Sequence, residues 1–246
     1  MEGIGREFLE KTRYQHLAPS EQERSVAQPP LQVRLGEGEV LELPDPRGVR
    51  DGGMSLRKAI EARRSLREYG AVALPLEELS YLLWCTQGVS KTIPDRATFR
   101  TVPSAGARHA FETVVLANRV DGLKPGTYQY LALEHRLARL DSAPDVADRM
   151  AEACLGQKMV RQSAATFVWI ADRRRMAWRY GERGVRYLFL DAGHVCQNLY
   201  LAAESIGCGA CAIGAFDDDR INGLLGLDGA ERFVVYLAPV GKKASV

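Results

Sequence analysis

Hydrophobic side chains recur at the spacing of an α-helix in three stretches of the sequence. The first stretch follows Ser55, whose hydroxyl suits the N-cap of a helix. Its apolar positions Leu56, Ala59 and Ile60 fall on one face, and the helix is expected to end near Arg63. The pattern therefore predicts a short amphipathic helix that leads directly into a cluster of arginines.

The other two stretches predict longer core helices. One is expected to begin at Pro75, because proline is favoured in the first turn, and to stop at Gly88. Its apolar face holds four leucines: Leu76, Leu79, Leu82 and Leu83. The other runs from about 185 to 206 with a wide apolar stripe and ends at Gly207. This longest helix is expected to be the scaffold of the core.

Short runs of β-branched, aromatic and aliphatic residues predict the strands. Residues 113–117 and 127–131 are runs of this kind, and a turn at 134–135 can lead into a third run at 136–140, which indicates antiparallel pairing. Residues 165–171 are apolar without interruption, as in a strand buried on both faces. This last strand should lie inside the sheet.

The C-terminal third predicts a strand at 210–213, a helix from Asp217 to about residue 225, and a final strand at 233–237. Helices and strands thus follow one another irregularly, without the strict alternation of a doubly wound sheet. A chain of 246 residues is long enough for one large domain. We therefore expect an α+β fold with a central mixed sheet flanked by helices.

Residues 1–50 differ from the rest because they mix charges with prolines and show little sustained periodicity. We interpret them as an N-terminal arm or extended lead-in, and residues 51–246 as the folded domain.

Composition narrows the possible partners and the compartment. Lys and Arg number 33 against 31 Asp and Glu, which argues against binding to nucleic acid. The N-terminus has no apolar signal-peptide core, and no stretch approaches the roughly 20 apolar residues of a membrane helix, so we expect a cytoplasmic protein without a membrane partner. The number of cysteines is odd and predicts no disulfide framework: Cys85, Cys154, Cys196, Cys208 and Cys211.

The first candidate for chemistry is the cluster Arg63, Arg64, Ser65 and Arg67 at the end of the short helix. Guanidinium groups bind phosphate oxygens in a bidentate manner and a serine hydroxyl adds a neutral donor, so the cluster suits a phosphate ester. The alternative is a solvated helix end, where cations are favoured by the helix dipole.

A second candidate is the segment 100–109, in which Pro103, Ser104, Ala105 and Gly106 suit a tight loop with exposed backbone donors. It could clasp a planar ligand or simply connect two elements.

Two further patterns are set aside. Residues 207–212 match a dinucleotide fingerprint but follow a helix instead of a strand, and the pair Cys208 and Cys211 lacks the setting of a redox or zinc site. No metal site is expected. On the long helix, a polar face is more often structural than catalytic. That face holds Asp191, His194 and Asn198.

Taken in order, these segments resemble the SagB-type dehydrogenases, a branch of the nitroreductase-like FMN oxidoreductases that oxidises azoline rings in peptides. The resemblance covers most of the chain and is carried by six segments: 61–70, 75–90, 99–112, 126–130, 180–209 and 234–243. It implies the nitroreductase-like fold, an intertwined homodimer with FMN at the interface, and two-electron ping-pong chemistry.

The resemblance also assigns residues to the flavin. It implies that Arg63, Arg64 and Ser65 hold the FMN phosphate and ribityl chain, and that Arg67 reaches toward flavin N1 and O2. It further implies that the partner's loop lines the isoalloxazine and that the backbone N–H of Gly214 points at N5. The implied set of further cofactor contacts is Pro103, Ser104, Ala105, Gly106, Ile213, Lys242 and Lys243.

One position departs from the family pattern. Azoline-oxidising relatives carry a Lys-Tyr pair at the place where this chain has Arg179 and Tyr180. Arginine keeps its proton near neutral pH, so it could orient an anion but not act as a base, whereas Tyr180 could donate a proton. The alternatives are an NAD(P)H-dependent nitro or quinone reductase and a flavin-free accessory subunit. Segments around Phe99, His109, Trp178 and Tyr180 are expected to select a small-molecule or peptide substrate.

Overall fold

A seven-stranded sheet forms the centre of the computed structural model, which describes residues 3–50 and 52–244. Its strands follow the order β1-β6-β5-β4-β7-β9-β8, and all neighbours pair antiparallel. They are β1 (Val40–Glu42), β4 (Phe111–Ala117), β5 (Gly126–Leu131), β6 (Arg136–Asp141), β7 (Ala165–Asp172), β8 (Cys208–Ala210) and β9 (Arg232–Lys242). The α+β class is confirmed, but the sheet is antiparallel instead of mixed, because parallel pairing occurs only in isolated bridges such as Ser65 with Ala210.

The interior position predicted for the apolar strand is confirmed. β7 lies between β4 and β9, and each of its eight residues is buried. Alternate side chains of a strand point to opposite faces, so a strand covered by helices on both sides needs apolar residues at every position. Phe167 and Trp169 face one layer of helices, whereas Val168 and Ile170 face the other.

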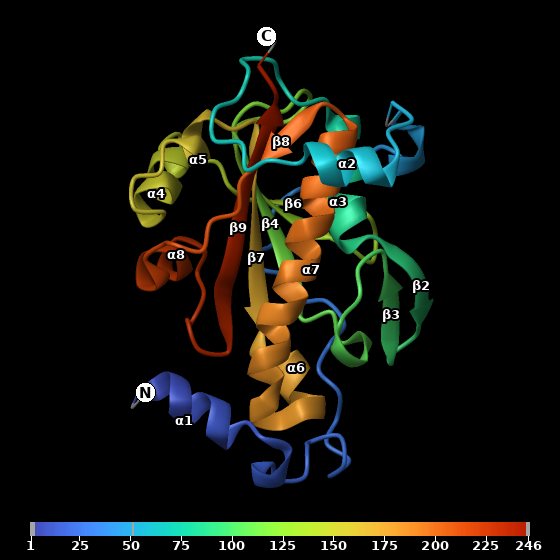
Figure 1. The fold of residues 1–246 in the computed structure, drawn as a ribbon, viewed down its shortest axis with the longest axis vertical. Coiled ribbons are helices and arrows are strands. Elements are labelled where there is room, and N and C mark those ends of the chain that lie inside the picture. The colour runs from blue at the N-terminus through green and yellow to red at the C-terminus, as the bar shows by residue number, and fades with distance from the viewer. Residues whose placement is uncertain (1–2, 51, 245–246) are drawn as a thin grey trace.

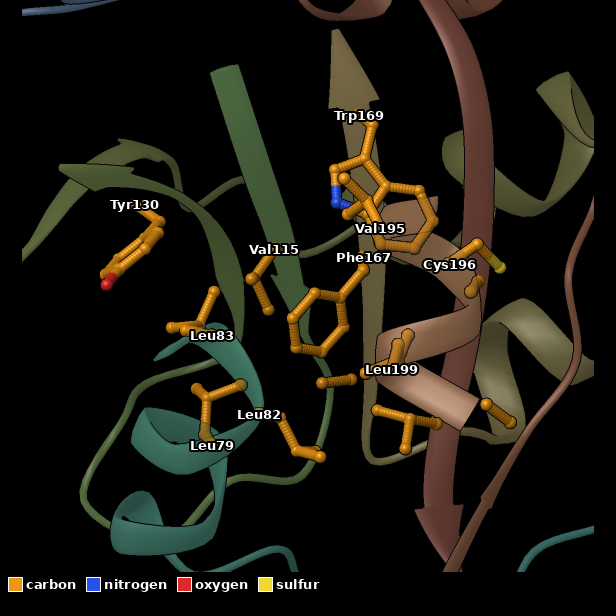
Figure 2. Close-up of a cluster of buried hydrophobic side chains, with 14 of the residues drawn as sticks. Leu79, Leu82, Leu83, Val115, Tyr130, Phe167, Trp169, Val195, Cys196 and Leu199 are labelled. Carbon is orange, nitrogen blue, oxygen red and sulfur yellow. The ribbon is translucent and has the colours of Figure 1, made fainter. Parts of the chain in front are cut away.

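Two long helices cover one face of the sheet. They are α3 (Leu76–Gln87) and α7 (Gly184–Ser205), close to the predicted bounds. Figure 2 shows Leu79, Leu82 and Leu83 of α3 and Leu199 of α7 packed against the side chains of the sheet. The predicted short helix α2 (Leu56–Ala62) lies across the C-terminal end of α7, and Ser55 is its N-cap (Figure 1).

The opposite face is covered by α4 (Val146–Ala153), α5 (Met159–Gln162) and α8 (Asp218–Leu224). Only α8 was predicted, and its N-cap Asp217 accepts a hydrogen bond from the backbone of Arg220. A further helix, α6 (Arg173–Tyr180), joins β7 to α7, and a separate hairpin is formed by β2 (Val89–Ile93) and β3 (Ala97–Arg100). In the part of the chain that the structure describes, no helix is long and apolar enough to cross a membrane.

The first fifty residues hold more regular structure than their sequence suggested. They contain the helix α1 (Ile4–Lys11) and the edge strand β1, which pairs with β6. Between them the chain runs along α6, where the Gln22 N–H donates to the carbonyl of Trp178 (2.8 Å) and the Trp178 Nε1–H donates to the carbonyl of Val26 (2.8 Å). The arm is therefore fastened to the helix that carries the two candidate catalytic residues (Figure 1).

Candidate active site

The arginine cluster lies where α2 ends and the chain turns alongside β8. Arg63 is the C-cap of α2, and the N–H of Leu66 donates to the carbonyl of Ala210 at 2.9 Å. This bond fixes the backbone between Arg63 and Arg67, while the side chains of Ser65 and Arg67 stay exposed. Arg64 bends back, and its Nη1 donates to the carbonyls of Glu61 (2.9 Å) and Arg63 (2.8 Å).

Tyr200 on α7 contacts Ser65 and Arg63 of this cluster, and it was not identified from the sequence. Its hydroxyl lies 3.1 Å from the Ser65 hydroxyl and accepts a hydrogen bond of 2.7 Å from the N–H of Ala212. The guanidinium of Arg63 lies over its ring, 5.2 Å from the centroid. Tyr200 thus joins the segment after α2 to the segment after β8. Its position on an amphipathic helix gave no signal that separated it from the core residues.

The segment after β8 places Ile213 and Gly214 beside the cluster. Ile213 is buried and exchanges two backbone hydrogen bonds with Leu237 of β9, at 2.8 and 3.1 Å. Gly214 is exposed, and its N–H has no partner among the residues described. A Cβ on Gly214 would come no closer than 3.6 Å to Tyr236, so the chain's own neighbours do not require a glycine. A need for glycine here would have to come from a ligand.

Arg67 belongs to the same surface. Burial raises the pKa of the Cys211 thiol, and the nearby guanidinium of Arg67 and hydroxyl of Ser65 oppose that shift. Within the described ranges Arg67 has no ion pair. Its charge is therefore available to a bound anion.

The two lysines near the C-terminus are already paired. Lys242 Nζ lies 2.6 Å from a carboxylate oxygen of Glu78 and donates to the carbonyl of Ile206 at 3.0 Å. Lys243 forms an ion pair with Glu204, whose side chain is buried. Each ammonium group carries three N–H donors, so either lysine could contact a phosphate while it keeps its carboxylate partner.

The loop with Pro103, Ser104, Ala105 and Gly106 is held against α7 by the polar face noted in the sequence. The carboxylate of Asp191 accepts from the N–H of Ala105 at 3.3 Å. Asn198 Nδ2 donates to the carbonyls of Cys85 (2.9 Å) and Thr101 (3.3 Å), and exposed His194 lies 4.0 Å from Asp191. Asp191 and Asn198 therefore hold the loop in place.

Gly106 brings the loop together with the candidate catalytic pair. Its φ is +56°, and a Cβ there would lie 2.4 Å from the Tyr180 hydroxyl and 3.0 Å from Arg179 Cδ. A larger residue here would have to displace the side chains of Tyr180 and Arg179, which glycine avoids. Tyr180 is half-buried and packs edge-on against Tyr187, with ring centroids 4.8 Å apart, whereas Arg179 is exposed.

The residues expected to select a substrate differ in how exposed they are. Phe99 is exposed. Trp178 and His109 are buried, and burial lowers the pKa of His109 to about 3, which keeps its imidazole neutral. Of this set, only Phe99 and Tyr180 are available to a ligand on the surface.

The candidate residues thus form two groups along α7. One group surrounds Tyr200, and the other surrounds the loop held by Asp191. Nine residues separate these two anchors, which corresponds to about 13 Å along a helix with a rise of about 1.5 Å per residue. Within one chain the loop and the arginine cluster are therefore separate.

The cysteines carry no reactive pair. Cys208 lies in a strand instead of at a helix N-terminus, and burial raises its pKa to about 12. In the described part of the chain, no cysteine forms a disulfide. The described ranges also contain no group of three His, Cys, Asp or Glu side chains that could hold a metal ion.

Comparison with known proteins identifies relatives. The sequence profile of the nitroreductase family matches residues 60–242. A Methanocaldococcus jannaschii protein provisionally named a nitroreductase is 34% identical over 209 residues, covering 85% of this chain and 99% of its own. The trifolitoxin-processing protein TfxB of Rhizobium leguminosarum bv. trifolii is 31% identical over 133 residues, covering 52% of this chain and 36% of its own.

Solved structures share the fold. A Ralstonia eutropha protein provisionally named a nitroreductase is 26% identical, with a TM-score of 0.68 and coverage of 84% of this chain and 90% of its own. A chain of the Escherichia coli microcin synthetase McbBCD complex is 18% identical, with a TM-score of 0.62 and coverage of 97% and 87%. The NADPH:FMN oxidoreductase of Vibrio harveyi is 19% identical, with a TM-score of 0.55 and coverage of 77% and 69%. At these last two identities the likeness concerns the fold alone.

Proposed function

The chain belongs to the nitroreductase family, and we propose that it is an FMN-dependent two-electron oxidoreductase of the SagB-type dehydrogenase branch. The observation that carries the FMN proposal is the surface around Tyr200. There, Arg63, Ser65, Arg67 and the unpaired N–H of Gly214 present positive charge and hydrogen-bond donors within two adjacent segments. Such a donor set suits a phosphate and the electron-rich edge of a flavin.

The residues fit FMN group by group. Arg63, Arg64 and Ser65 would hold the phosphate and ribityl chain, and Gly214 would donate its N–H to N5. Arg67 would place a fixed cation near N1 and O2, where reduction adds negative charge. When bound, the flavin supplies the ability to accept or donate a hydride. Lys242 and Lys243 would add cationic contacts to the phosphate while keeping their carboxylate partners, because each ammonium group carries three N–H donors.

A homodimer completes the proposal. Apolar side chains are exposed on α7 and α2, namely Phe189 (55%), Leu190 (60%), Leu56 (66%) and Ile60 (56%). Exposed apolar patches of this kind mark interaction surfaces. A second copy covering them would bring its loop 103–106 toward the arginine cluster of the first. The five free thiols agree with a cytoplasmic location for such a dimer.

Two observations bear on the substrate, and they support different candidate reactions. The likeness to a trifolitoxin-processing protein supports a peptide substrate. Arg179 supports a second candidate, an NAD(P)H-dependent nitro or quinone reductase, because arginine does not act as a general base at neutral pH. In either reaction Arg179 would orient an anion and the Tyr180 hydroxyl would donate a proton or a hydrogen bond.

The direct test is to titrate the purified protein with FMN and to compare two variants. We expect a yellow complex in which Ser65→Ala combined with Arg67→Ala weakens FMN binding by about tenfold or more, because charge-assisted hydrogen bonds are lost. Arg57→Ala is the matched control, since Arg57 lies on α2 and forms an ion pair with exposed Glu61. A colourless protein that takes up no FMN would favour a flavin-free accessory subunit instead.

A second experiment separates the two candidate reactions. The FMN complex is exposed under anaerobic conditions to NADPH or to an azoline-containing peptide, and bleaching of the flavin absorbance is followed. Bleaching by the peptide supports the dehydrogenase, whereas bleaching by NADPH alone supports the reductase.

A further inference from the structure

A cavity of about 550 Å³ lies between the N-terminal arm and the end of α6. Tyr14, Leu17 and Pro19 of the arm form one wall, and Arg179, Tyr180 and Arg183 form the other. The cavity therefore opens on the same Arg179 and Tyr180 that contact Gly106. The arm encloses space next to the candidate catalytic pair.

The arm is fixed over this cavity by stacked aromatic and cationic side chains. The guanidinium of Arg183 lies 4.4 Å from the ring centroid of Tyr14, and its Nε donates to the Tyr187 hydroxyl at 2.8 Å. The hydroxyls of Tyr14 and Tyr187 lie 3.2 Å apart, and Arg183 Nη1 donates to the carbonyl of Thr12 at 2.9 Å. Tyr187 in turn packs against Tyr180. These contacts thus hold Tyr14 in place in the cavity wall.

The charge around the cavity is positive. Within the described ranges Arg179, Arg183 and Arg108 have no carboxylate partner, and Arg108 Nε donates to the carbonyl of Gly106 at 3.2 Å. Burial lowers the pKa of Arg108, and the charge of Arg179 lowers it further. Glu23 is the acidic residue that lines the cavity, and its carboxylate accepts from the N–H and the hydroxyl of Ser20.

The position of Arg179 in the last turn of α6 favours a cation through the helix dipole. The dipole does not account for Arg183, the second arginine in the lining, or for the aromatic wall supplied by Tyr14, which lies 165 positions before Arg179 in the sequence. Both features are expected of a site for an anionic ligand with an apolar body.

We propose that this cavity binds a carboxylate of the substrate, with Arg179 as its counter-ion and with Tyr14 and Tyr180 as aromatic walls. This proposal rests on the proposed function. The arm then belongs to the substrate site of its own chain. Arg179 orients the acid group, and selection between substrates follows from whether they carry one.

The test compares 4-nitrobenzoate with 4-nitrobenzamide, which differ in charge but hardly in shape. Binding is measured by calorimetry with the FMN complex and with flavin-free protein, and reaction is followed as reoxidation of dithionite-reduced flavin by each compound. We expect the natural sequence to favour the acid by about tenfold or more. Arg179→Ala should abolish this preference in binding, measured with the FMN complex and with the flavin-free protein.

Two further variants keep the test specific. Arg174→Ala removes an exposed arginine from the same helix but outside this cavity, and it should leave the preference unchanged. Tyr14→Ala should weaken both ligands by a similar factor because it removes a wall and not the counter-ion. The proposal is overturned if Arg179→Ala keeps the preference for the acid, if Arg174→Ala loses it equally, or if Tyr14→Ala changes neither affinity. A protein that takes up no FMN in the titration but still prefers 4-nitrobenzoate would refute the proposed function and leave the cavity assignment intact.

Discussion

At the scale of single residues, Tyr200 is the clearest positioning residue for the candidate flavin site. One hydroxyl joins Ser65 to Ala212, and one ring supports Arg63. Because these contacts link two segments that each supply a proposed flavin contact, Tyr200 should act on FMN through them without touching it.

We predict that Tyr200→Phe weakens FMN binding several-fold and lowers the free energy of unfolding by about 1 kcal/mol, the usual contribution of a hydrogen bond. Fluorescence titration with FMN and urea unfolding measure the two effects. Tyr128→Phe is the control, because the Tyr128 hydroxyl donates to the carbonyl of Lys124 at 2.7 Å on another part of the molecule. Equal FMN affinities of the two variants would contradict the role given to Tyr200.

A second prediction concerns Gly106. Gly106→Ala places a methyl group 2.4 Å from the Tyr180 hydroxyl in a backbone conformation that alanine disfavours. Gly156→Ala carries the same kind of backbone strain, but no atom lies within 4 Å of its Cβ. We expect Gly106→Ala to unfold at lower urea, by at least about 1 kcal/mol relative to Gly156→Ala. Equal stabilities would mean that Tyr180 does not pack against the loop.

Some residues of the candidate site could be predicted from the sequence, and others could not. The arginines after α2 could be found because they cluster within five positions. The contact of Gly106 with Tyr180 could not, because it joins positions 74 residues apart that no local pattern links. Tyr200 was missed because a tyrosine on an amphipathic helix has the same spacing as its core neighbours.

At the scale of elements, α6 is anchored by a buried ion pair. Arg175 Nη2 lies 2.6 Å from a carboxylate oxygen of Glu112 on β4, and both side chains are almost fully buried. The same carboxylate accepts from the N–H of Val33 in the arm at 2.9 Å. One carboxylate thus contacts both α6 and the N-terminal arm.

We predict that Arg175→Met lowers the free energy of unfolding by about 3–5 kcal/mol, because it leaves Glu112 buried without its partner. Combining it with Glu112→Gln should recover part of that loss, since the uncompensated charge is removed. Arg174→Met, at the exposed neighbouring position, serves as the control in the same urea series. A loss for Arg175→Met no greater than for Arg174→Met would show that the ion pair does not anchor α6.

The long periodic elements could be predicted from the sequence, as could the short helices α2 and α8, which follow the N-cap residues Ser55 and Asp217, but α4, α5 and α6 could not. α3 and α7 have enough turns to establish a helical period, and β7 is apolar at every position. The segments α4, α5 and α6 contain four to eight residues, too few to establish a period. β9 extends beyond the predicted end at residue 237 and continues through Pro239 to Lys242, although proline lacks the N–H that a strand interior uses.

At the scale of the whole molecule, the exposed apolar faces of α2 and α7 are expected to form the dimer interface. Leu190→Asp should produce monomers that no longer retain FMN, because a charge would be buried at the contact and the partner's loop would be lost. Leu155→Asp is the matched control, since Leu155 is 64% exposed and follows α4 on the opposite face of the sheet. Size-exclusion chromatography with light scattering gives the mass, and an unchanged dimer for Leu190→Asp would contradict this interface.

The most direct test of an FMN-dependent homodimer is sedimentation velocity of the purified protein with one equivalent of FMN per chain, recorded at the absorbance of the flavin. For a homodimer that binds FMN, we predict that the flavin signal sediments with a species of twice the mass of the chain, at one FMN per chain. Flavin that remains unsedimented, or that moves with a species of single-chain mass, would contradict it.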